Sequence, residues 1–306
     1  MRIAVVGARG QLAAAVAHEC APAHEIVALA HADLDVTDDA AVAAAMDRIR
    51  PDLIVNGAAF NDVDAAEDRP VDALNLNAFA VRALSRAAQA LGATLVHYST
   101  DFVFDGRATQ PYSESDRPSP RSVYAASKLV GEWFALEAPR GYVLRVESLF
   151  GRAPGGGPEK GSVASILKTL AAGGSPKVFE DRTISPTYIP DAARATRRLV
   201  ETNAPPGLYH CVNSGRCTWF ELAQEAVRLL GQPEWEARLV PVRMSEMPLK
   251  AARPQFCALA NDKLRAAGVD MPSWREAMAE YVAQIKRSSS GAEQARPPQT
   301  SESRGS

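Results

Sequence analysis

A tyrosine and a lysine four positions apart, Tyr124 and Lys128, combine residue types and a spacing that could do chemistry. On a helix, this spacing places the phenol and the ammonium on one face, about 5–6 Å apart at Cβ. A free phenol has a pKa of about 10, and a neighbouring cation favours the phenolate, which moves the pKa toward the range of efficient proton transfer. The same spacing also occurs in solvated helix pairs, so the surroundings must decide between the two interpretations.

A hydroxyl and a carboxylate, those of Thr100 and Asp101, follow directly after an apolar segment that is typical of a strand. Ligands of open α/β sheets bind outside the carboxyl ends of the strands. At that edge, Thr100 could donate a hydrogen bond to a carbonyl oxygen that becomes an alkoxide. We therefore expect Tyr124, Lys128 and Thr100 to be the catalytic residues.

A glycine loop, Gly7-Ala8-Arg9-Gly10-Gln11-Leu12, follows the first predicted strand and opens a helix. Backbone amides at a helix N-terminus, approached through glycines, can bind a pyrophosphate. Ala13 stands where a third glycine is usual, and alanine is tolerated there. A glycine turn formed for geometric reasons alone is the alternative. The loop residues that we expect to bind a dinucleotide are Gly7, Arg9, Gly10, Gln11 and Leu12.

The end of the second predicted strand, Ala30-His31-Ala32, offers no carboxylate for a ribose hydroxyl. Arg9 could instead pair with a 2′-phosphate, which favours NADPH over NADH as the cofactor. The remaining cofactor contacts that we expect are Asp35, Val36, Ala58, Ala59 and Ser99.

Short β-branched segments alternate with alanine-rich helical segments through the first half of the chain. The expected strands are 2–6, 25–29, 53–56, 94–99 and 142–146, and the expected helices are 11–19, 39–49, 70–91 and 123–136. This alternation predicts an α/β fold with a Rossmann-like, doubly wound parallel sheet. We expect an NAD(P)-binding domain over 1–150, a smaller α/β substrate lobe over 151–287 with some return of the chain to the first domain, and a disordered tail over 288–306.

Composition excludes several classes of protein. The 306 residues carry 34 basic and 36 acidic side chains, a net charge of −2, which leaves no positive surplus for nucleic acid. No segment approaches the roughly 18 apolar residues of a membrane span, and no secretory signal is recognised, so we expect a cytoplasmic protein. The four cysteines lack metal-ligand spacing, and we expect no required metal.

Several motifs together resemble the extended short-chain dehydrogenase/reductase superfamily and, within it, the dTDP-4-dehydrorhamnose reductase family. They are the glycine loop, Ser99-Thr100-Asp101-Phe102-Val103-Phe104-Asp105-Gly106, Tyr124-Ala-Ala-Ser-Lys128, Asp181-Arg182-Thr183-Ile184-Ser185-Pro186-Thr187 and Ala252-Arg253-Pro254. The resemblance extends from residue 1 to about 285. It implies NAD(P)H-dependent reduction of the 4-keto group of a nucleotide-linked 6-deoxy sugar, that is, dTDP-4-dehydrorhamnose to dTDP-rhamnose. A homodimer is left open.

The resemblance also implies roles for individual residues. Tyr124 would protonate the alkoxide at C4, Lys128 would bind the nicotinamide ribose and lower the pKa of the tyrosine, and Thr100 would hold the ketone oxygen. The substrate contacts that it implies are Thr100, Asp101, Phe102, Ser148, Thr187 and Arg253.

One segment departs from the family pattern. The family usually has Arg-Thr-Ser-Trp after the fifth strand, whereas this chain has Arg145-Val146-Glu147-Ser148. The tryptophan that would pack against the methyl face of the sugar is absent, and Glu147 brings a carboxylate nearby. Asp181-Arg182 either shapes the same pocket or forms a surface turn. Two alternatives therefore stay open: a nucleotide-sugar epimerase or a reductase of another 4-keto sugar, and a non-catalytic dinucleotide-binding regulatory subunit of the methionine adenosyltransferase type.

Overall fold

The centre of the molecule is a parallel sheet of six strands in the order β10-β5-β4-β3-β1-β2. The computed structural model describes residues 1–153 and 159–294. The strands of this sheet are β1 (Arg2–Val6), β2 (Glu25–Leu29), β3 (Leu53–Asn56), β4 (Thr94–Thr100), β5 (Gly141–Val146) and β10 (Gly207–His210). Residues of β1, β3 and β4 are buried on both faces, because helices cover the sheet on both sides.

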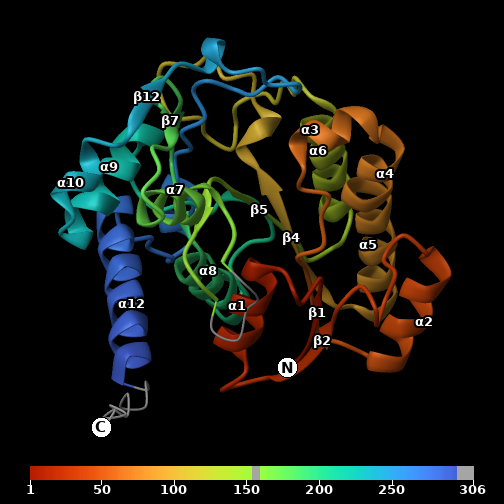
Figure 1. Cartoon of the computed structure of the whole chain (residues 1–306). Coiled ribbons are helices and arrows are strands. Elements are labelled where there is room, and N and C mark those ends of the chain that lie inside the picture. The colour runs from red at the N-terminus through yellow and green to blue at the C-terminus, as the bar shows by residue number, and fades with distance from the viewer. Residues whose placement is uncertain (154–158, 295–306) are drawn as a thin grey trace, which may run out of the picture.

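Two layers of helices enclose this sheet, as the sequence predicts (Figure 1). Helices α1 (Gln11–Cys20) and α8 (Ile189–Glu201) pack together on one face, where Val16 and Leu199 share a buried apolar cluster. Helices α2 (Asp39–Ile49), α5 (Ala80–Leu91) and α6 (Val123–Leu136) cover the other face. The predicted Rossmann-like doubly wound fold is confirmed.

Polar residues fix the first turns of the helices that carry the site. Ser122 precedes α6, and its hydroxyl accepts the N–H of Ala125, which places Tyr124 in the first turn of that helix. Gly10 precedes α1 and has no side chain with which to bond the free amides. The N-terminus of α1 thus keeps backbone donors for a ligand.

The segment predicted as one helix over 70–91 is divided into three. Helix α4 (Pro70–Leu74) leads into a π-helical turn, η1 (Asn75–Phe79), before α5 begins, and α3 (Val63–Asp68) precedes them. The π turn places the buried amide of Asn77 against the backbone of Phe60, to whose N–H it is bonded at 2.8 Å. A helical period alone does not reveal such a turn, because the apolar spacing continues through it.

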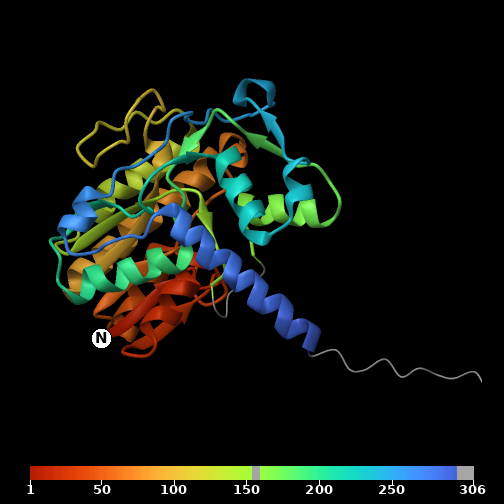
Figure 2. The same ribbon diagram turned by 90° about the vertical axis from the view of Figure 1, so that its left-hand side faces the viewer.

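The second half contributes both to this sheet and to a separate apolar core. Although β10 and α8 come late in the chain, they complete the parallel sheet and one of its helical layers. Most other elements surround the second core, to one side of the sheet layer (Figure 2). The remaining elements are β6 (Leu149–Phe150), α7 (Ser162–Ala171), β7 (Lys177–Phe179), β8 (Thr183–Ile184), β9 (Thr187–Tyr188), β11 (Cys217–Thr218), α9 (Trp219–Leu230), α10 (Pro233–Glu236), β12 (Val240–Val242), α11 (Asp262–Ala266), α12 (Trp274–Gln294) and the 3₁₀ turns η2 (Asp101–Val103) and η3 (Met244–Glu246).

The last helix is longer than the sequence suggests. Helix α12 continues to Gln294, past residue 288, where the tail was predicted to begin. The remainder of the predicted tail lies outside the described residues. Among the described helices, none combines the length and the apolar character that crossing a bilayer requires.

Candidate active site

Tyr124 and Thr100 meet at the carboxyl edge of the sheet. Thr100 is the last residue of β4, Tyr124 lies in the first turn of α6, and both side chains are buried. The Thr100 hydroxyl is close enough to the Tyr124 phenol to act on its pKa. The sequence predicted this meeting, and it gives the edge a paired hydroxyl and phenol.

Lys128 lies one helical turn beyond Tyr124 and is buried as well. Its Nζ donates to the main-chain carbonyl of Tyr98 at 2.5 Å. Burial lowers the pKa of Lys128 to about 8, while the carboxylate of Glu132 acts in the opposite direction. The solvated helix pair that was the alternative interpretation is therefore excluded.

The pKa of the phenol differs from the prediction. Burial raises the pKa of Tyr124 above its ordinary value, the nearby Thr100 hydroxyl opposes this, and the charge of Asp101 adds to the rise. The expected lowering by Lys128 is wrong for the chain by itself, because desolvation of the phenol dominates and Nζ is bonded to a carbonyl. The phenol therefore stays protonated at neutral pH, as a proton donor must.

The glycine loop and the turn after β3 are in direct contact. Gly7 has φ +70°, and a Cβ at this position would lie 2.6 Å from the backbone nitrogen of Ala58. A Cβ on Gly57 would lie 2.7 Å from that of Ala13, the residue in the packing position of the motif. These close approaches require glycine at both positions. The N-terminus of α1 has no side-chain cap, which fits the binding of a dinucleotide pyrophosphate. The close contacts thus give these glycines a geometric reason of their own, and the uncapped amides of α1 are the feature that a cofactor would use.

The three other residues of the glycine loop that were predicted to bind the cofactor differ in their exposure and contacts. Arg9 is exposed and forms no ion pair within the described part of the chain. Gln11 faces the backbone of Lys160, to which its amide can bond at 3.0 and 3.1 Å. Leu12 is buried in the core, so any contact with a cofactor must come from its backbone.

Some of the side chains predicted to line the adenosine site make their contacts within the protein instead. Asp35 accepts hydrogen bonds from the backbone and hydroxyl of Thr37, at 2.9 and 2.7 Å. The side chain of Val36 is in the apolar core rather than at the surface. Ala58 and Ala59 are partly buried beside the glycine loop. The hydroxyl of Ser99 donates to Glu132 at 2.6 Å in the interior, so that side chain is not directed to a cofactor.

On the substrate side, an aromatic ring joins the phenol to a buried cation. The ring of Phe102 meets that of Tyr124 edge to face, with centroids 5.6 Å apart. The guanidinium of Arg182 lies 5.0 Å from the centroid of the Phe102 ring and 3.6 Å from Oδ2 of Asp101. Arg182 was left open between a pocket residue and a surface turn, and the structure buries it in the pocket wall.

Arg182 also lines a cavity of about 690 Å³ between α7, β7 and the segment after β12. Arg253 is a second basic residue of its wall and forms two hydrogen bonds with Asp64 of α3, at 3.0 and 2.9 Å. This pairing keeps the pKa of Asp64 below its ordinary value. Both guanidiniums in the cavity wall are paired with carboxylates, Arg182 with Asp101 and Arg253 with Asp64.

One of the predicted substrate residues, Thr187, is placed otherwise. Thr187 is completely buried, and its hydroxyl accepts the N–H of Glu147 at 3.2 Å. The structure therefore does not place Thr187 at the pocket surface, since the pairing of β6 with β9 covers it. Ser148 has φ +46° and is partly buried beside it.

A family model described as the RmlD substrate binding domain matches residues 1–287. The chain belongs to this family. A dTDP-4-dehydrorhamnose reductase of Streptomyces griseus is 37% identical over 262 residues, which cover 83% of this chain and 84% of that protein. A probable dTDP-4,6-dihydroxy-2-methyloxan-3-one 4-ketoreductase of Streptomyces antibioticus is 36% identical over 294 residues, covering 93% and 96%.

A solved structure of this RmlD family has the same fold. The dTDP-4-dehydrorhamnose reductase of Bacillus anthracis in complex with NADP superimposes with a TM-score of 0.86 at 31% identity. The alignment covers 92% of this chain and 99% of that one.

Two structural supports of this RmlD-family site were missed by the sequence reasoning. Glu132 receives two hydrogen bonds from the buried Arg145, each 2.7 Å long, behind Lys128. Asn77 bonds to the hydroxyl of Ser127 at 2.9 Å and so ties α6 to the loop after β3. The signal for Glu132 was its place one turn after Lys128. No signal in the sequence marked Asn77, because the π-helical turn that positions it depends on contacts formed only in the folded chain.

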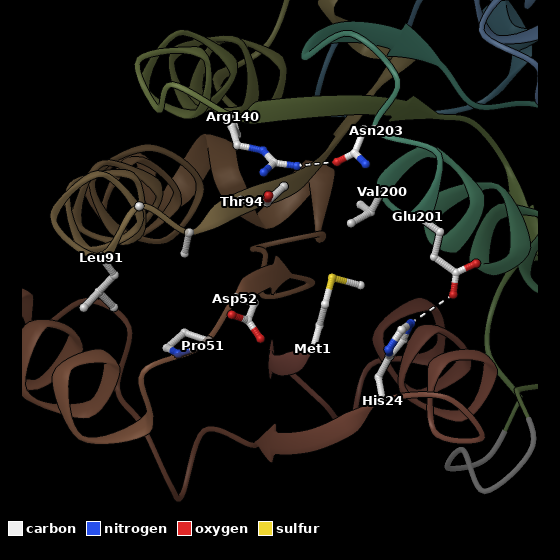
Figure 3. Close-up of a pocket in the computed structure, with 12 residues that line it drawn as sticks. Met1, His24, Pro51, Asp52, Leu91, Thr94, Arg140, Val200, Glu201 and Asn203 are labelled. Carbon is white, nitrogen blue, oxygen red and sulfur yellow. Dashed lines mark hydrogen bonds and ion pairs between the residues drawn. The ribbon is translucent and has the colours of Figure 1, made fainter.

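A second hollow, of about 580 Å³, opens at the opposite edge of the sheet (Figure 3). Two pairs of its polar side chains are bonded to each other: His24 to Glu201 at 2.9 Å, and Arg140 to Asn203 at 2.8 Å. It lies at the amino ends of the strands, where Met1 and Thr94 are found, and not at the edge where parallel sheets bind ligands. It is separate from the site that contains Tyr124.

Proposed function

We propose that the chain is an NAD(P)H-dependent reductase that acts on the 4-keto group of a nucleotide-linked 6-deoxy sugar, converting dTDP-4-dehydrorhamnose to dTDP-rhamnose. The observation that carries this proposal is the meeting of the buried Tyr124 and Thr100 at the carboxyl edge of the sheet, the edge at which the glycine loop follows β1. The similarity to dTDP-4-dehydrorhamnose reductase of Streptomyces griseus supports the choice of substrate.

The loop that contains Gly7 and Gly10 would hold the cofactor, with the uncapped amides in the first turn of α1 available to its pyrophosphate. When bound, it supplies the hydride that reduces the carbonyl. Arg9, exposed at this loop, pairs with a 2′-phosphate, so NADPH is preferred to NADH. Comparison of kcat/KM for the two cofactors tests this preference, and a lower value for NADPH would contradict it.

Tyr124 gives its phenolic proton to the C4 oxygen as that oxygen becomes an alkoxide. Thr100 holds the same oxygen in line with the phenol, since both side chains occupy one edge of the sheet. Lys128, one turn away and cationic below a pH of about 8, stabilises the phenolate that remains. Because no group has to move far, positioning supplies much of the rate enhancement.

The nucleotide part of the substrate occupies the cavity of about 690 Å³. Arg182 and Arg253, which line it, bind the diphosphate, for which the planar guanidinium is well suited. Asp101 and Phe102 lie between this cavity and Tyr124 and contact the sugar, with Ser148 nearby.

The test is to mix purified protein with NADPH and a panel of nucleotide-linked 4-keto sugars and to follow the absorbance of the reduced nicotinamide. We expect one NADPH to be oxidised per sugar reduced, with the highest kcat/KM for dTDP-4-dehydrorhamnose. A higher value for a 2-deoxy sugar would change the proposed substrate. No oxidation with any sugar would overturn the reductase, and copurified NAD without net consumption would indicate an epimerase.

A further inference from the structure

Two buried carboxyl groups lie next to Thr100 with a single cation between them. Asp101 and Glu147 are 2% and 1% exposed, and the guanidinium of Arg182 is 3.6 Å from Oδ2 of Asp101. One carboxyl oxygen of each acid and the sulfur of Cys257 lie within 4.8 Å of one another. With both acids ionised and Arg182 cationic, this group would carry a net negative charge in the interior.

Three polar atoms of this group have no hydrogen-bond partner among the described residues: Oδ2 of Asp101, Oε1 of Glu147 and Nε of Arg182. The other oxygen of Glu147 accepts the N–H of Ser185 at 2.7 Å, so the side chain is held in place. Buried polar atoms without partners are rare and call for an explanation such as a proton or a ligand that hydrogen positions do not reveal.

The charges around Glu147 favour uptake of one proton. The groups that face it are Asp101 after β4, Arg182 before β8, Cys257 and Cys217 of β11. Burial raises the pKa of Glu147 well above its usual range, and the charge of Asp101 adds to the rise. Burial also raises the pKa of Asp101, against the effect of Arg182. Two buried carboxyls beside one guanidinium therefore favour the retention of one proton by the pair.

The location of this proton determines what the Thr100 hydroxyl can do. Its oxygen accepts the N–H of Phe102 at 3.2 Å, and its single proton is directed to Oδ1 of Asp101 at 2.9 Å. While Asp101 is a carboxylate, Thr100 has no proton left for another acceptor. A protonated Asp101 could instead donate to Thr100, which would free the Thr100 hydroxyl to donate at the edge where Tyr124 lies.

We propose that Asp101 and Glu147 form a proton reservoir that returns a proton to Tyr124 through the Thr100 hydroxyl after each reduction. Glu147 acts through Asp101 and Thr100 and does not touch the substrate. This proposal rests on the proposed reduction, in which Tyr124 gives up its proton.

The steps balance without any electron transfer. The O–H bond of Tyr124 breaks when its proton passes to the C4 oxygen. The Thr100 O–H bond then breaks as the phenol re-forms, and the O–H bond on Oδ1 of Asp101 breaks as the Thr100 hydroxyl re-forms. Both acids are then carboxylates, and the pair recovers one proton from solvent water.

The test uses Glu147→Gln, which keeps an acceptor for the Ser185 N–H but cannot store the proton. Infrared spectra at neutral pH should show the carbonyl stretch of a protonated carboxyl group in the wild-type protein and its loss in this variant. The matched control is Asp191→Asn, which removes another buried carboxyl, one bonded to Asn213 and outside the group. This control should keep the part of the band that Glu147→Gln removes.

Kinetics separate proton return from proton donation. With enzyme in excess, the first turnover of Glu147→Gln should match that of the wild type, because Tyr124 begins protonated. Its steady-state kcat should fall about tenfold or more, since each later turnover waits for proton return. A parallel loss in both measurements, an unchanged kcat, or no protonated-carboxyl band in the wild type would each overturn the reservoir.

A divalent ion is the competing occupant of this group. Binding of one Zn²⁺ per chain that Glu147→Gln abolishes, measured by calorimetry, would overturn the proposal in favour of a metal site. If the wild type oxidises no NADPH with any sugar, the proposed reduction fails, while the infrared comparison still decides whether the proton is stored.

Discussion

Glu132 and Arg145 form a two-bonded ion pair in the interior, with both hydrogen bonds at 2.7 Å and almost no exposed surface on either side chain. Glu132 also accepts from Ser99 at the end of β4. The pair therefore joins α6, β4 and β5, the three elements that hold Tyr124, Thr100 and Lys128 in place. The pair contributes to the site by fixing α6 to the sheet.

Glu132→Ala should lower the free energy of unfolding by about 3–5 kcal/mol, because it leaves the Arg145 guanidinium buried without a counter-charge. Urea unfolding followed by circular dichroism measures the change. The control is Asp47→Ala, which removes an exposed ion pair with Arg50 and should cost about 0–1 kcal/mol. Equal effects in the two variants would contradict the structural role.

Gly7→Ala should weaken NADPH binding by about tenfold or more, because the new Cβ would displace the backbone at Ala58 and disturb the amides at the start of α1. Fluorescence titration with NADPH measures the dissociation constant. Gly92 is a matched control, since its φ of +67° is nearly the same but no atom lies near its added Cβ. Gly92→Ala should cost stability of about 1–2 kcal/mol from backbone strain alone and leave NADPH binding unchanged.

The pKa of Lys128 predicts an alkaline limit to activity. Since burial lowers this pKa to about 8, the side chain is an ammonium below that pH and an amine above it. Only the ammonium stabilises the phenolate, so kcat/KM for NADPH should fall as the pH rises through about 8. Glu132→Gln removes a charge that raises this pKa and should move the decline to lower pH. A profile that stays level well beyond this pH in the wild type would contradict the role of Lys128.

Much of the sheet was predictable because its strands are short apolar segments in a regular alternation with helices. The ranges 2–6, 25–29, 53–56 and 123–136 match the structure residue for residue. Helix α8 was not among the predicted elements, although its apolar residues recur with a helical period and Pro190 stands in its first turn, where proline is compatible with a helix.

The site was predictable in its parts but not in its electrostatics. The types and spacing of Tyr124, Lys128 and Thr100 indicated which side chains would meet. Nothing in the sequence indicated that burial would outweigh the effect of Lys128 on the phenol. The meeting of Glu147 with Arg182 likewise depends on loops that are far apart in the chain, and only the folded structure brings their charges together.

The most direct test of the account is Tyr124→Phe, assayed with NADPH and dTDP-4-dehydrorhamnose alongside NADPH binding. The variant keeps the ring that packs against Phe102 but lacks the proton donor. We predict that kcat falls about 10²–10⁴-fold while the dissociation constant of NADPH stays within roughly twofold of the wild type. A turnover close to that of the wild type would contradict the role of Tyr124 as the proton donor.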